Sequence, residues 1–444
     1  MPDSLTIQLV NQTTSSNVHA FITGLAIQHN MARVFLQADG KGLYFPESPP
    51  PDQILQPLTQ DCAIPLGAPG NSVTVTIPQM AGARLWFSAE KQLTFLRNPG
   101  GPGGGAALVE PSVLNPSDPN ADVDFAFCEF TLNNDQLFAN ISYVDFVPRL
   151  PIALTLQTRG GAVQHVSGMA PDGLERVCRG LREQAAADGW PWDKLIVQKQ
   201  DGQPPLRVLS PTHGATTGAN FDGYFEPLVE AAWQKYRQQQ QQQPSPQQQQ
   251  PPPKHHRFRL PLMGRGPSPP PPTPPQAPTS TPLQINTQAG PGILTGTVST
   301  DADAGPDAPL LIGTEPFTRP TTADILGCNS GPFATGHPDP SRAATRAAII
   351  PRLAAAFQRG AICVTTEHPS APETFYPPGG EARSNHYCRV VHECNLDGKG
   401  YAFAYDDVQP DGGADQSGKV NAGDPAVLIV AVGGGGAYVG DRMP

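Results

Sequence analysis

Short runs of strand-forming residues, separated by clusters of Gly, Pro and Asn, fill the first third of this 444-residue chain. Short runs with turn signals between them are typical of β-sandwiches and β-barrels. The expected strands are Leu5–Val10, Ala20–Ile27, Ala32–Ala38, Ser72–Ile77, Arg84–Ser88 and Gln92–Leu96. This part of the chain is therefore predicted to be mainly β.

Beyond Asp145 the sequence takes on helical periodicity, which begins with an apolar stripe of Leu174, Val177, Cys178 and Leu181. The expected helices are Asp172–Asp188, Pro227–Gln238 and Ser341–Phe357. Further strands are expected at Gly292–Val298, Ala361–Thr366, Tyr387–Cys394, Gly400–Asp407 and Ala426–Val432. Helices that follow a β-region predict an α+β subdomain packed on a β-sandwich.

A Gln- and Pro-rich tract lies between Gln238 and Leu283. Of its 46 residues, 15 are Pro and 11 are Gln, so more than half of the tract cannot contribute to a packed core. We expect it to be disordered. By composition alone it resembles a boundary between two domains.

Two adjacent strand-like segments, 125–133 and 137–145, each carry a carboxylate in an aromatic setting. In the first segment a two-residue period places Glu129, Thr131 and Asn133 on one face of the strand. A turn-prone stretch joins the segments and predicts an antiparallel hairpin, with Glu129 and Asp145 across a groove from each other. Two carboxylates that flank a bond are the minimum equipment for glycoside hydrolysis. The alternative is that both are solvated surface residues.

The charge of the chain excludes some partners. The formal net charge is −10, and charged residues make up only 15% of the chain. Nucleic-acid binders present a basic surface, so no nucleic-acid partner is expected. No stretch approaches the roughly 20 apolar residues that a membrane span needs. A charge-poor surface suits a neutral polysaccharide, although it suits many other soluble proteins as well.

Metal and cofactor signals are weak. His386, Cys388, His392 and Cys394 follow the spacing H-x-C-x₃-H-x-C, which matches no standard zinc pattern. The Gly-rich run at 100–105 lacks the strand–Gly–helix context of a phosphate-binding loop. We therefore expect neither a metal nor a cofactor.

The N-terminal residues enter an alternating strand pattern at once. They show neither the basic nor the apolar segment of an export signal. The chain as written is therefore expected to be soluble and without an export signal.

The hairpin motifs resemble a known family. Glu129-Phe-Thr-Leu-Asn133 together with Ile141-Ser-Tyr-Val-Asp145 is similar to the acidic-cleft motif of thaumatin-like proteins, and more specifically of the family 64 glycoside hydrolases. Three further segments agree with this resemblance: Leu5–Asn11, Arg84-Leu-Trp86, and the stretch from Asn385 to Asp407. The similarity covers roughly residues 3–237 and 285–437, on both sides of the Gln/Pro-rich tract.

The resemblance implies a single catalytic unit over residues 3–437. Its thaumatin-like β-sandwich or barrel would comprise about 3–157 and C-terminal strands within about 385–437. A smaller α/β subdomain would comprise about 158–237 and 285–384, with a wide groove between the two parts. Residues 238–284 would then be a disordered insertion. An insertion in a surface loop costs little, because closure entropy grows only logarithmically with length.

The resemblance also implies a function, namely endo-acting hydrolysis of β-1,3-glucan to short oligosaccharides, typically pentasaccharides. Glu129 matches the general acid and Asp145 the general base of an inverting mechanism, and Thr131 and Asn133 match residues that contact the glucan. The family is typically extracellular, and a monomer is expected. The alternative is a non-catalytic, glucan-binding antifungal thaumatin-like protein.

Other residues near the predicted cleft are candidates for binding sugar. Arg84 borders the cleft by resemblance, and the paired acids Asp406 and Asp407 end a predicted strand, where they either bind sugar hydroxyls or cap a turn. The candidate aromatic platforms, each of which has core packing as its alternative, are Trp86, Phe138 and Tyr143.

Overall fold

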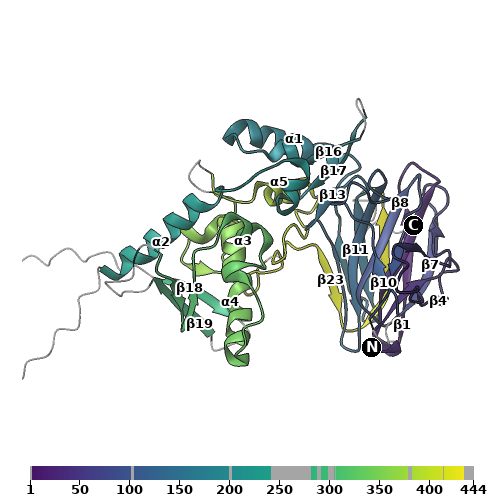
Figure 1. The fold of residues 1–444 in the computed structure, drawn as a ribbon, viewed down its shortest axis with the longest axis horizontal. Coiled ribbons are helices and arrows are strands. Elements are labelled where there is room, and N and C mark those ends of the chain that lie inside the picture. The colour runs from purple at the N-terminus through teal and green to yellow at the C-terminus, as the bar shows by residue number, and fades with distance from the viewer. Residues whose placement is uncertain are drawn as a thin grey trace, which may run out of the picture.

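The computed structural model describes residues 3–101, 105–199, 203–241, 282–287, 292–298, 305, 307–378, 383–413 and 415–434. Two large sheets lie together in one part of the molecule, and helices with a further sheet form the rest (Figure 1). Most of the Gln/Pro-rich tract predicted to be disordered lies outside the described residues.

The first large sheet contains both ends of the described chain. Its five strands follow the order β15-β14-β24-β1-β7. The central strand β24 pairs in parallel with β1 and antiparallel with β14. The strands are β1 (Ser4–Asn11), β7 (Ser72–Pro78), β14 (Ile152–Thr158), β15 (Val163–Val166) and β24 (Pro425–Val432).

The second large sheet carries the predicted hairpin. Its main path is β23-β12-β11-β8-β2-β3-β4, and β6 pairs with β2. The strands are β2 (Val18–Ala26), β3 (Ala32–Leu36), β4 (Leu43–Tyr44), β6 (Ile64–Pro65), β8 (Met80–Ala89), β11 (Asp124–Leu132), β12 (Leu137–Ile141) and β23 (Lys419–Ala422). The inner faces of both sheets share one core, in which Ile7 and Leu9 of β1 cluster with Ile22 of β2 and Cys128 of β11.

A second apolar cluster covers part of the outer face of this sheet. It contains Phe21, Trp86 and Phe127 from the sheet, together with Phe146 and Leu209 from neighbouring strands. Two small sheets contribute to the cover, in the orders β10-β9-β5 and β13-β17-β16. Their strands are β5 (Gln56–Pro57), β9 (Leu96–Asn98), β10 (Ala107–Val109), β13 (Phe146–Pro148), β16 (Ile196–Gln198) and β17 (Pro205–Leu209).

The helices gather away from the two large sheets (Figure 1). Helix α1 packs on α5 above the sandwich, whereas α2 and α4 pack on a five-stranded sheet of order β21-β20-β19-β18-β22. The helices are α1 (Gly173–Asp188), α2 (Glu226–Gln241), α3 (Thr322–Gly327), α4 (Pro340–Gln358) and α5 (His386–Cys394). The strands are β18 (Leu283–Thr287), β19 (Gly292–Val298), β20 (Leu310–Ile312), β21 (Glu315–Phe317) and β22 (Glu367–His368). Among the described residues, no helix is both long and apolar enough to cross a bilayer.

Most predicted elements of the first third are confirmed, as are the three long helices and the strands at 292–298 and 426–432. The second hairpin strand ends earlier than predicted, at Ile141. Four predicted strands are wrong. Of Gln92–Leu96 only the last residue is in a strand, Ala361–Thr366 starts with a 3₁₀ turn, and most of Gly400–Asp407 forms turns.

The fourth wrong strand, Tyr387–Cys394, lies in helix α5. Its buried residues include Tyr387, Val390, Val391 and Cys394, which is the i, i+3, i+4, i+7 spacing of one helix face. The side chain of Asn385 accepts a hydrogen bond from the backbone of Cys388 and caps the first turn.

Candidate active site

A row of polar residues crosses the outer face of the large sheet at right angles to its strands. Thr23 of β2 opposes Arg84 of β8, which opposes Glu129 of β11. Glu129 in turn opposes Asn140 of β12, and Asn140 opposes Lys419 of β23. Since neighbouring strands lie about 4.8 Å apart, the row spans about 19 Å. Directly opposed residues share a face of the sheet, so these side chains form one polar strip beside the apolar cluster.

Arg84, the second residue of this strip, contacts two carboxylates. Its Nε lies 3.2 Å from Oε1 of Glu129, and its Nη1 lies 2.8 Å from Oε2 of Glu110. The guanidinium also lies over the rings of Trp86 and Phe127, 5.5 and 4.9 Å from their centroids. Two carboxylates and two aromatic faces therefore hold the arginine in one orientation.

Glu129 lines an open cavity of about 430 Å³. Arg84, Thr131, Phe138 and Asn140 also line it. The structure thus brings together four of the predicted site residues, Glu129, Thr131, Arg84 and Phe138. The side chain of Glu129 is 38% exposed, so its carboxylate can reach a ligand in the cavity.

Asp145 lies directly before β13, at the end of the loop that follows the hairpin. Its Oδ1 is 3.1 Å from Nε2 of His213. The hydrogen bond from His213 holds the pKa of Asp145 below its ordinary value, against the effect of burial. The positive charges of His213 and Arg84 act in the same direction. Arg84 contacts Glu129 and its charge also lowers the pKa of Asp145, but the two carboxylates line different cavities.

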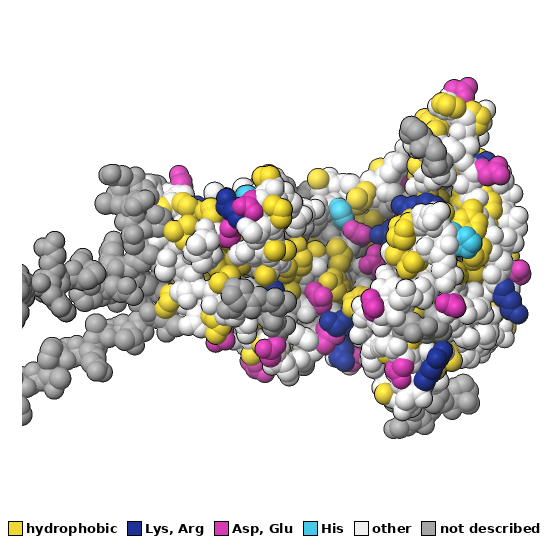
Figure 2. All heavy atoms as spheres, turned by 90° about the horizontal axis from the view of Figure 1, so that it is seen from below, with side chains coloured by type: hydrophobic (Ala, Val, Ile, Leu, Met, Phe, Trp, Pro, Cys, Tyr) yellow, Lys and Arg dark blue, Asp and Glu magenta, His cyan; other side chains and the backbone are white. Residues whose placement is uncertain are grey.

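A second cavity, of about 260 Å³, lies beside Asp145. Asp145, His213, Asn329 and Asn385 line it, the last two from the segments next to α3 and α5. Seen from below, the surface is hollowed between the two parts of the molecule, and acidic, basic and histidine side chains gather near the hollow (Figure 2).

A third cavity, of about 670 Å³, shares Ala404 with the second. Its lining includes Tyr401, Tyr405, Asp407 and Arg352. The hydroxyl of Tyr401 donates to Oδ1 of Asp407 over 3.0 Å. Asp407 therefore lines a cavity while one of its oxygens accepts a hydrogen bond from the protein itself, and its contact with sugar stays a prediction.

Two predicted aromatic platforms are buried instead. Trp86 is 1% exposed, and its Nε1 donates to the hydroxyl of Thr23 over 3.1 Å. Tyr143 is 3% exposed, and its hydroxyl donates to the side chain of Asn395. The prediction that they stack on sugar is wrong, because the period of a strand gives the face of a residue but not what covers that face.

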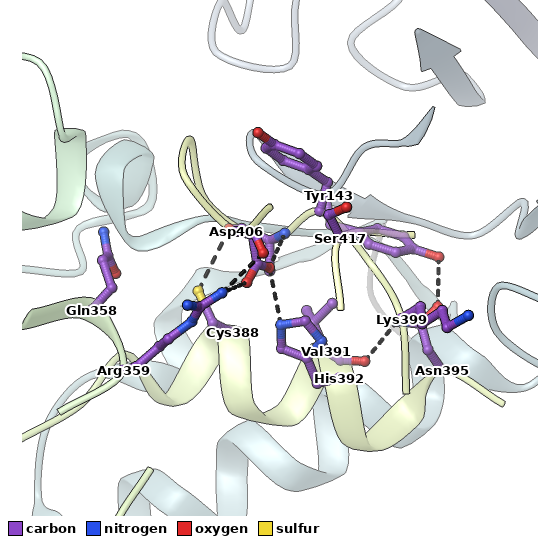
Figure 3. A network of polar contacts seen from close by, with 12 residues as sticks. Tyr143, Gln358, Arg359, Cys388, Val391, His392, Asn395, Lys399, Asp406 and Ser417 are labelled. Carbon is purple, nitrogen blue, oxygen red and sulfur yellow. Dashed lines mark hydrogen bonds and ion pairs between the residues drawn. The ribbon is translucent and has the colours of Figure 1, made fainter. Parts of the chain in front are cut away.

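Asp406 is a structural residue and not a sugar ligand (Figure 3). It is 1% exposed, and its carboxylate contacts Nη2 of Arg359 at 3.1 Å and Nε2 of His392 at 2.9 Å. It also accepts the backbone N–H of Ala402. A carboxylate with three protein partners and almost no exposed area has no room for a sugar hydroxyl.

Asn133 has a structural role too. Its Oδ1 accepts the backbone N–H groups of Asp135 and Gln136 and closes the hairpin turn. The predicted glucan contact is therefore not available to that oxygen.

Within the described part of the chain, no group of three or more His, Cys, Asp or Glu residues is arranged to hold a metal ion. The His and Cys residues of the H-x-C-x₃-H-x-C motif, His386 to Cys394, lie on α5, where His392 contacts Asp406. All seven cysteines are unpaired, and Cys128 is buried as predicted.

Two residues of the site escaped prediction from the sequence. His213 lies 68 positions from Asp145, and Glu110 lies 26 positions from Arg84. Both contacts cross between separate elements, so no periodic pattern connects the partners. The Ser-Pro-Thr-His stretch that ends at His213 was the available signal, because Pro favours the first turn of a helix.

An open groove with carboxylates on its walls is the arrangement with which glycoside hydrolases act on sugar chains. The family model for family 64 of these enzymes, described as β-1,3-glucanase, matches residues 3–250 and 277–432. The chain belongs to this family, and the resemblance noted in the sequence is confirmed.

Two relatives share the name glucan endo-1,3-beta-glucosidase. The protein of Cellulosimicrobium cellulans is 26% identical over 366 residues, and that of Arthrobacter sp. (strain YCWD3) is 25% identical over 360 residues. Each alignment covers 81% of this chain and 53% of the relative. The chain thus spans about half the length of the curated relatives it matches.

Solved structures share the fold. A laminaripentaose-producing β-1,3-glucanase in complex with laminaritetraose is 25% identical, with a TM-score of 0.72, and the match covers 97% of this chain and 99% of that chain. A β-1,3-glucanase domain from Clostridium beijerinckii is 19% identical, with a TM-score of 0.64 and coverage of 97% and 98%.

Proposed function

We propose that this chain is an endo-acting β-1,3-glucanase that cleaves glucan of the laminarin type to short oligosaccharides. The observation that carries the proposal is that, in a member of this family, Glu129 lines one open cavity beside Arg84 and Asp145 lines a second cavity beside His213. The names of the curated relatives and the laminaritetraose bound to the structural neighbour support the choice of substrate.

In the proposed mechanism Glu129 is the general acid and Asp145 the general base. Glu129 gives a proton to the glycosidic oxygen, while Asp145 removes a proton from the water that attacks the anomeric carbon. A base must be ionised, and the lowered pKa of Asp145 supports this assignment. Inversion requires carboxyl groups about 6.5–9.5 Å apart, with the water held between one of them and the sugar.

The glucan would lie along the polar strip and pass through the three cavities. Thr131 and Phe138 lie next to Glu129, where a hydroxyl and an aromatic face suit the polar edge and apolar face of a pyranose ring. Tyr401, Tyr405 and Asp407 would contact sugars farther from the cleavage point.

The proposal extends to the architecture. We propose a thaumatin-like sandwich flanked by a smaller α/β subdomain, with a wide substrate groove between them and residues 238–284 as an insertion in one catalytic unit over residues 3–437. The second cavity supports this arrangement, because residues of both parts line it. A monomer suffices, since all proposed site residues come from this one chain.

The test is incubation of the purified protein and its Glu129→Gln variant with laminarin. We expect the wild type to release oligosaccharides whose first-formed anomer, observed by ¹H NMR, is α, and the variant to bind glucan without releasing products. A wild type that binds laminarin but releases no reducing ends would instead be the glucan-binding protein without catalysis. Full activity of Glu129→Gln would reject the assignment of the acid.

A further inference from the structure

We propose that His213 is a positioning residue for the general base, because its imidazole holds the carboxylate of Asp145 in orientation. The inference rests on the proposed function and adds to it a residue outside the pair of carboxylates. A single segment, 209–213, contacts Asp145 twice, once at its backbone and once at its side chain.

The first contact fixes the backbone of Asp145. Strands β13 and β17 pair antiparallel, with Phe146 opposite Leu209. The backbone N–H of Ser210 then donates to the carbonyl of Asp145 over 2.9 Å and extends the ladder by one residue. The backbone of Asp145 is therefore fixed at the end of a strand and not in a free loop.

The second contact fixes the side chain of Asp145. A 3₁₀ turn, η3 (Pro211–Thr217), begins directly after Ser210. In this turn the backbone N–H of His213 donates a hydrogen bond to the carbonyl of Ser210 over 2.9 Å. This turn brings Nε2 of His213 to 3.1 Å from Oδ1 of Asp145. The side chain of His213 is 20% exposed, whereas that of Asp145 is 44% exposed. The histidine thus supports the carboxylate from the protein side and leaves it open to the groove.

The turn that carries His213 is itself anchored. The hydroxyl of Thr212 donates to the carbonyl of Leu326 in α3 over 3.1 Å, and Gly214 accepts the backbone N–H of Ala219. The position of the imidazole therefore depends on the contact between this turn and α3. A misplacement of about 1 Å at a reacting group can cost about 10²-fold in rate, so such anchoring matters.

Among the described residues, the groups whose charge interacts with that of Asp145 come from three separate elements. They are His213 from η3, Arg84 from β8 and Tyr387 from α5. Among the described residues His213 alone donates a side-chain hydrogen bond to this carboxylate. Arg84 is already bound to Glu110 and Glu129, so it is not free to replace the imidazole.

The experiment compares His213→Ala, His213→Gln and the control His29→Asn, whose histidine is exposed on a turn next to Phe45. The kcat/KM on laminarin is measured against pH, and the carboxylate of Asp145 is titrated by ¹³C NMR. We expect His213→Ala to lose about 10–10²-fold of kcat/KM, mainly in kcat, and to shift the acid limb and the titration of Asp145 to higher pH. His213→Gln restores a hydrogen-bond donor, so it should recover most of kcat and return the acid limb most of the way toward its wild-type position.

The control His29→Asn should behave as the wild type in both measurements. A hydrolysing wild type whose acid limb and Asp145 titration are the same in His213→Ala overturns this inference alone, even when the rate falls. A wild type that releases no oligosaccharide overturns the proposed function, and the catalytic role of His213 with it. The NMR titration needs no turnover, so these two failures are distinguishable.

Discussion

Arg84 and Glu129 are directly opposed in the ladder between β8 and β11, and Nε of the arginine lies 3.2 Å from Oε1 of the glutamate. The shorter contact of the same guanidinium, at 2.8 Å, is to Glu110. The hydroxyl of Thr23 also hydrogen-bonds to Glu110 over 3.2 Å and accepts the indole N–H of Trp86. The buried aromatic cluster thus sets the position of the arginine, and the arginine sets that of the proposed acid.

Replacing Arg84 with Lys should therefore lower kcat/KM on laminarin by about 10–10²-fold. Lysine keeps the positive charge but has neither the planar fork that bridges Glu110 and Glu129 nor the flat face that lies over the aromatic rings. Steady-state kinetics are the measurement. The matched control is Arg97→Lys, whose arginine donates to backbone carbonyls at the surface. Wild-type kinetics for Arg84→Lys would show that the bridge has no catalytic role.

Glu110→Gln and Glu129→Gln form a second matched pair, because both change a carboxylate that contacts Arg84. Loss of a general acid costs about 10²–10⁴-fold, and Glu129→Gln should fall in this range with an unchanged melting temperature. Glu110→Gln keeps the side-chain shape and the proposed acid, so its loss of kcat should be smaller. Equal losses in both variants would contradict the distinct role given to Glu129.

Trp86→Ala should lower the stability of the fold, whereas Phe138→Ala should weaken the binding of laminarin. Trp86→Ala removes a buried indole, so it should lower the free energy of unfolding by about 3–5 kcal/mol, measured by urea titration. Phe138→Ala removes a ring from the cavity next to Glu129. An aromatic contact contributes about 0.5–1.5 kcal/mol, so KM for laminarin should rise about 2–12-fold in Phe138→Ala with little change in stability. The reverse pattern would restore Trp86 as a sugar platform.

The pattern of β11 could be predicted from the sequence, because a strand with one face in the core has a strict period of two. Cys128, Phe130 and Leu132 are buried, while Glu129 and Thr131 are not. The same period places Phe127 on the face of Glu129, yet Phe127 is only 7% exposed. The second apolar cluster covers that end of the face, and this cover comes from strands far away in the sequence.

Other errors have the same origin. Short apolar runs do not distinguish a buried strand from a buried helix, which explains why α5 was predicted as a strand. Asp406 follows a run of aromatic and small residues, so the sequence suggested a turn or an exposed strand end. Its burial depends on Arg359 and His392, which come from elements 47 and 14 positions away. Long-range ion pairs leave no local pattern to read.

Asp406→Asn should be strongly destabilising. Removing one member of a buried ion pair leaves its partners buried without compensation, at a cost of about 3–5 kcal/mol. The matched control is Asp407→Asn, since Asp407 is half-buried and its carboxylate accepts a hydrogen bond from the neutral hydroxyl of Tyr401. Urea unfolding should give a much smaller loss for the control. Equal stabilities of the two variants would contradict the anchoring role of Asp406.

The buried pair of Asp406 and His392 should make the free energy of unfolding depend on pH, with opposite signs for the two residues. Burial alone would raise the pKa of Asp406, but the charge and hydrogen bond of His392 and the charge of Arg359 outweigh it and hold the pKa below its ordinary 3.8. Burial alone would lower the pKa of His392, but attraction to Asp406 and the hydrogen bonds raise it above 6.5. The contribution of Asp406 is present above pH 3.8 and is lost as pH falls through its folded pKa.

The contribution of His392 has the opposite sign. It is fully present below pH 6.5 and is lost as pH rises through the folded pKa of the histidine. The difference in urea midpoint between the wild type and His392→Gln should therefore be largest in weakly acidic solution and should shrink toward alkaline pH. A difference that stays constant up to alkaline pH would mean that His392 binds Asp406 as a neutral imidazole, and that the hydrogen bond without the charge holds this part of the groove in place.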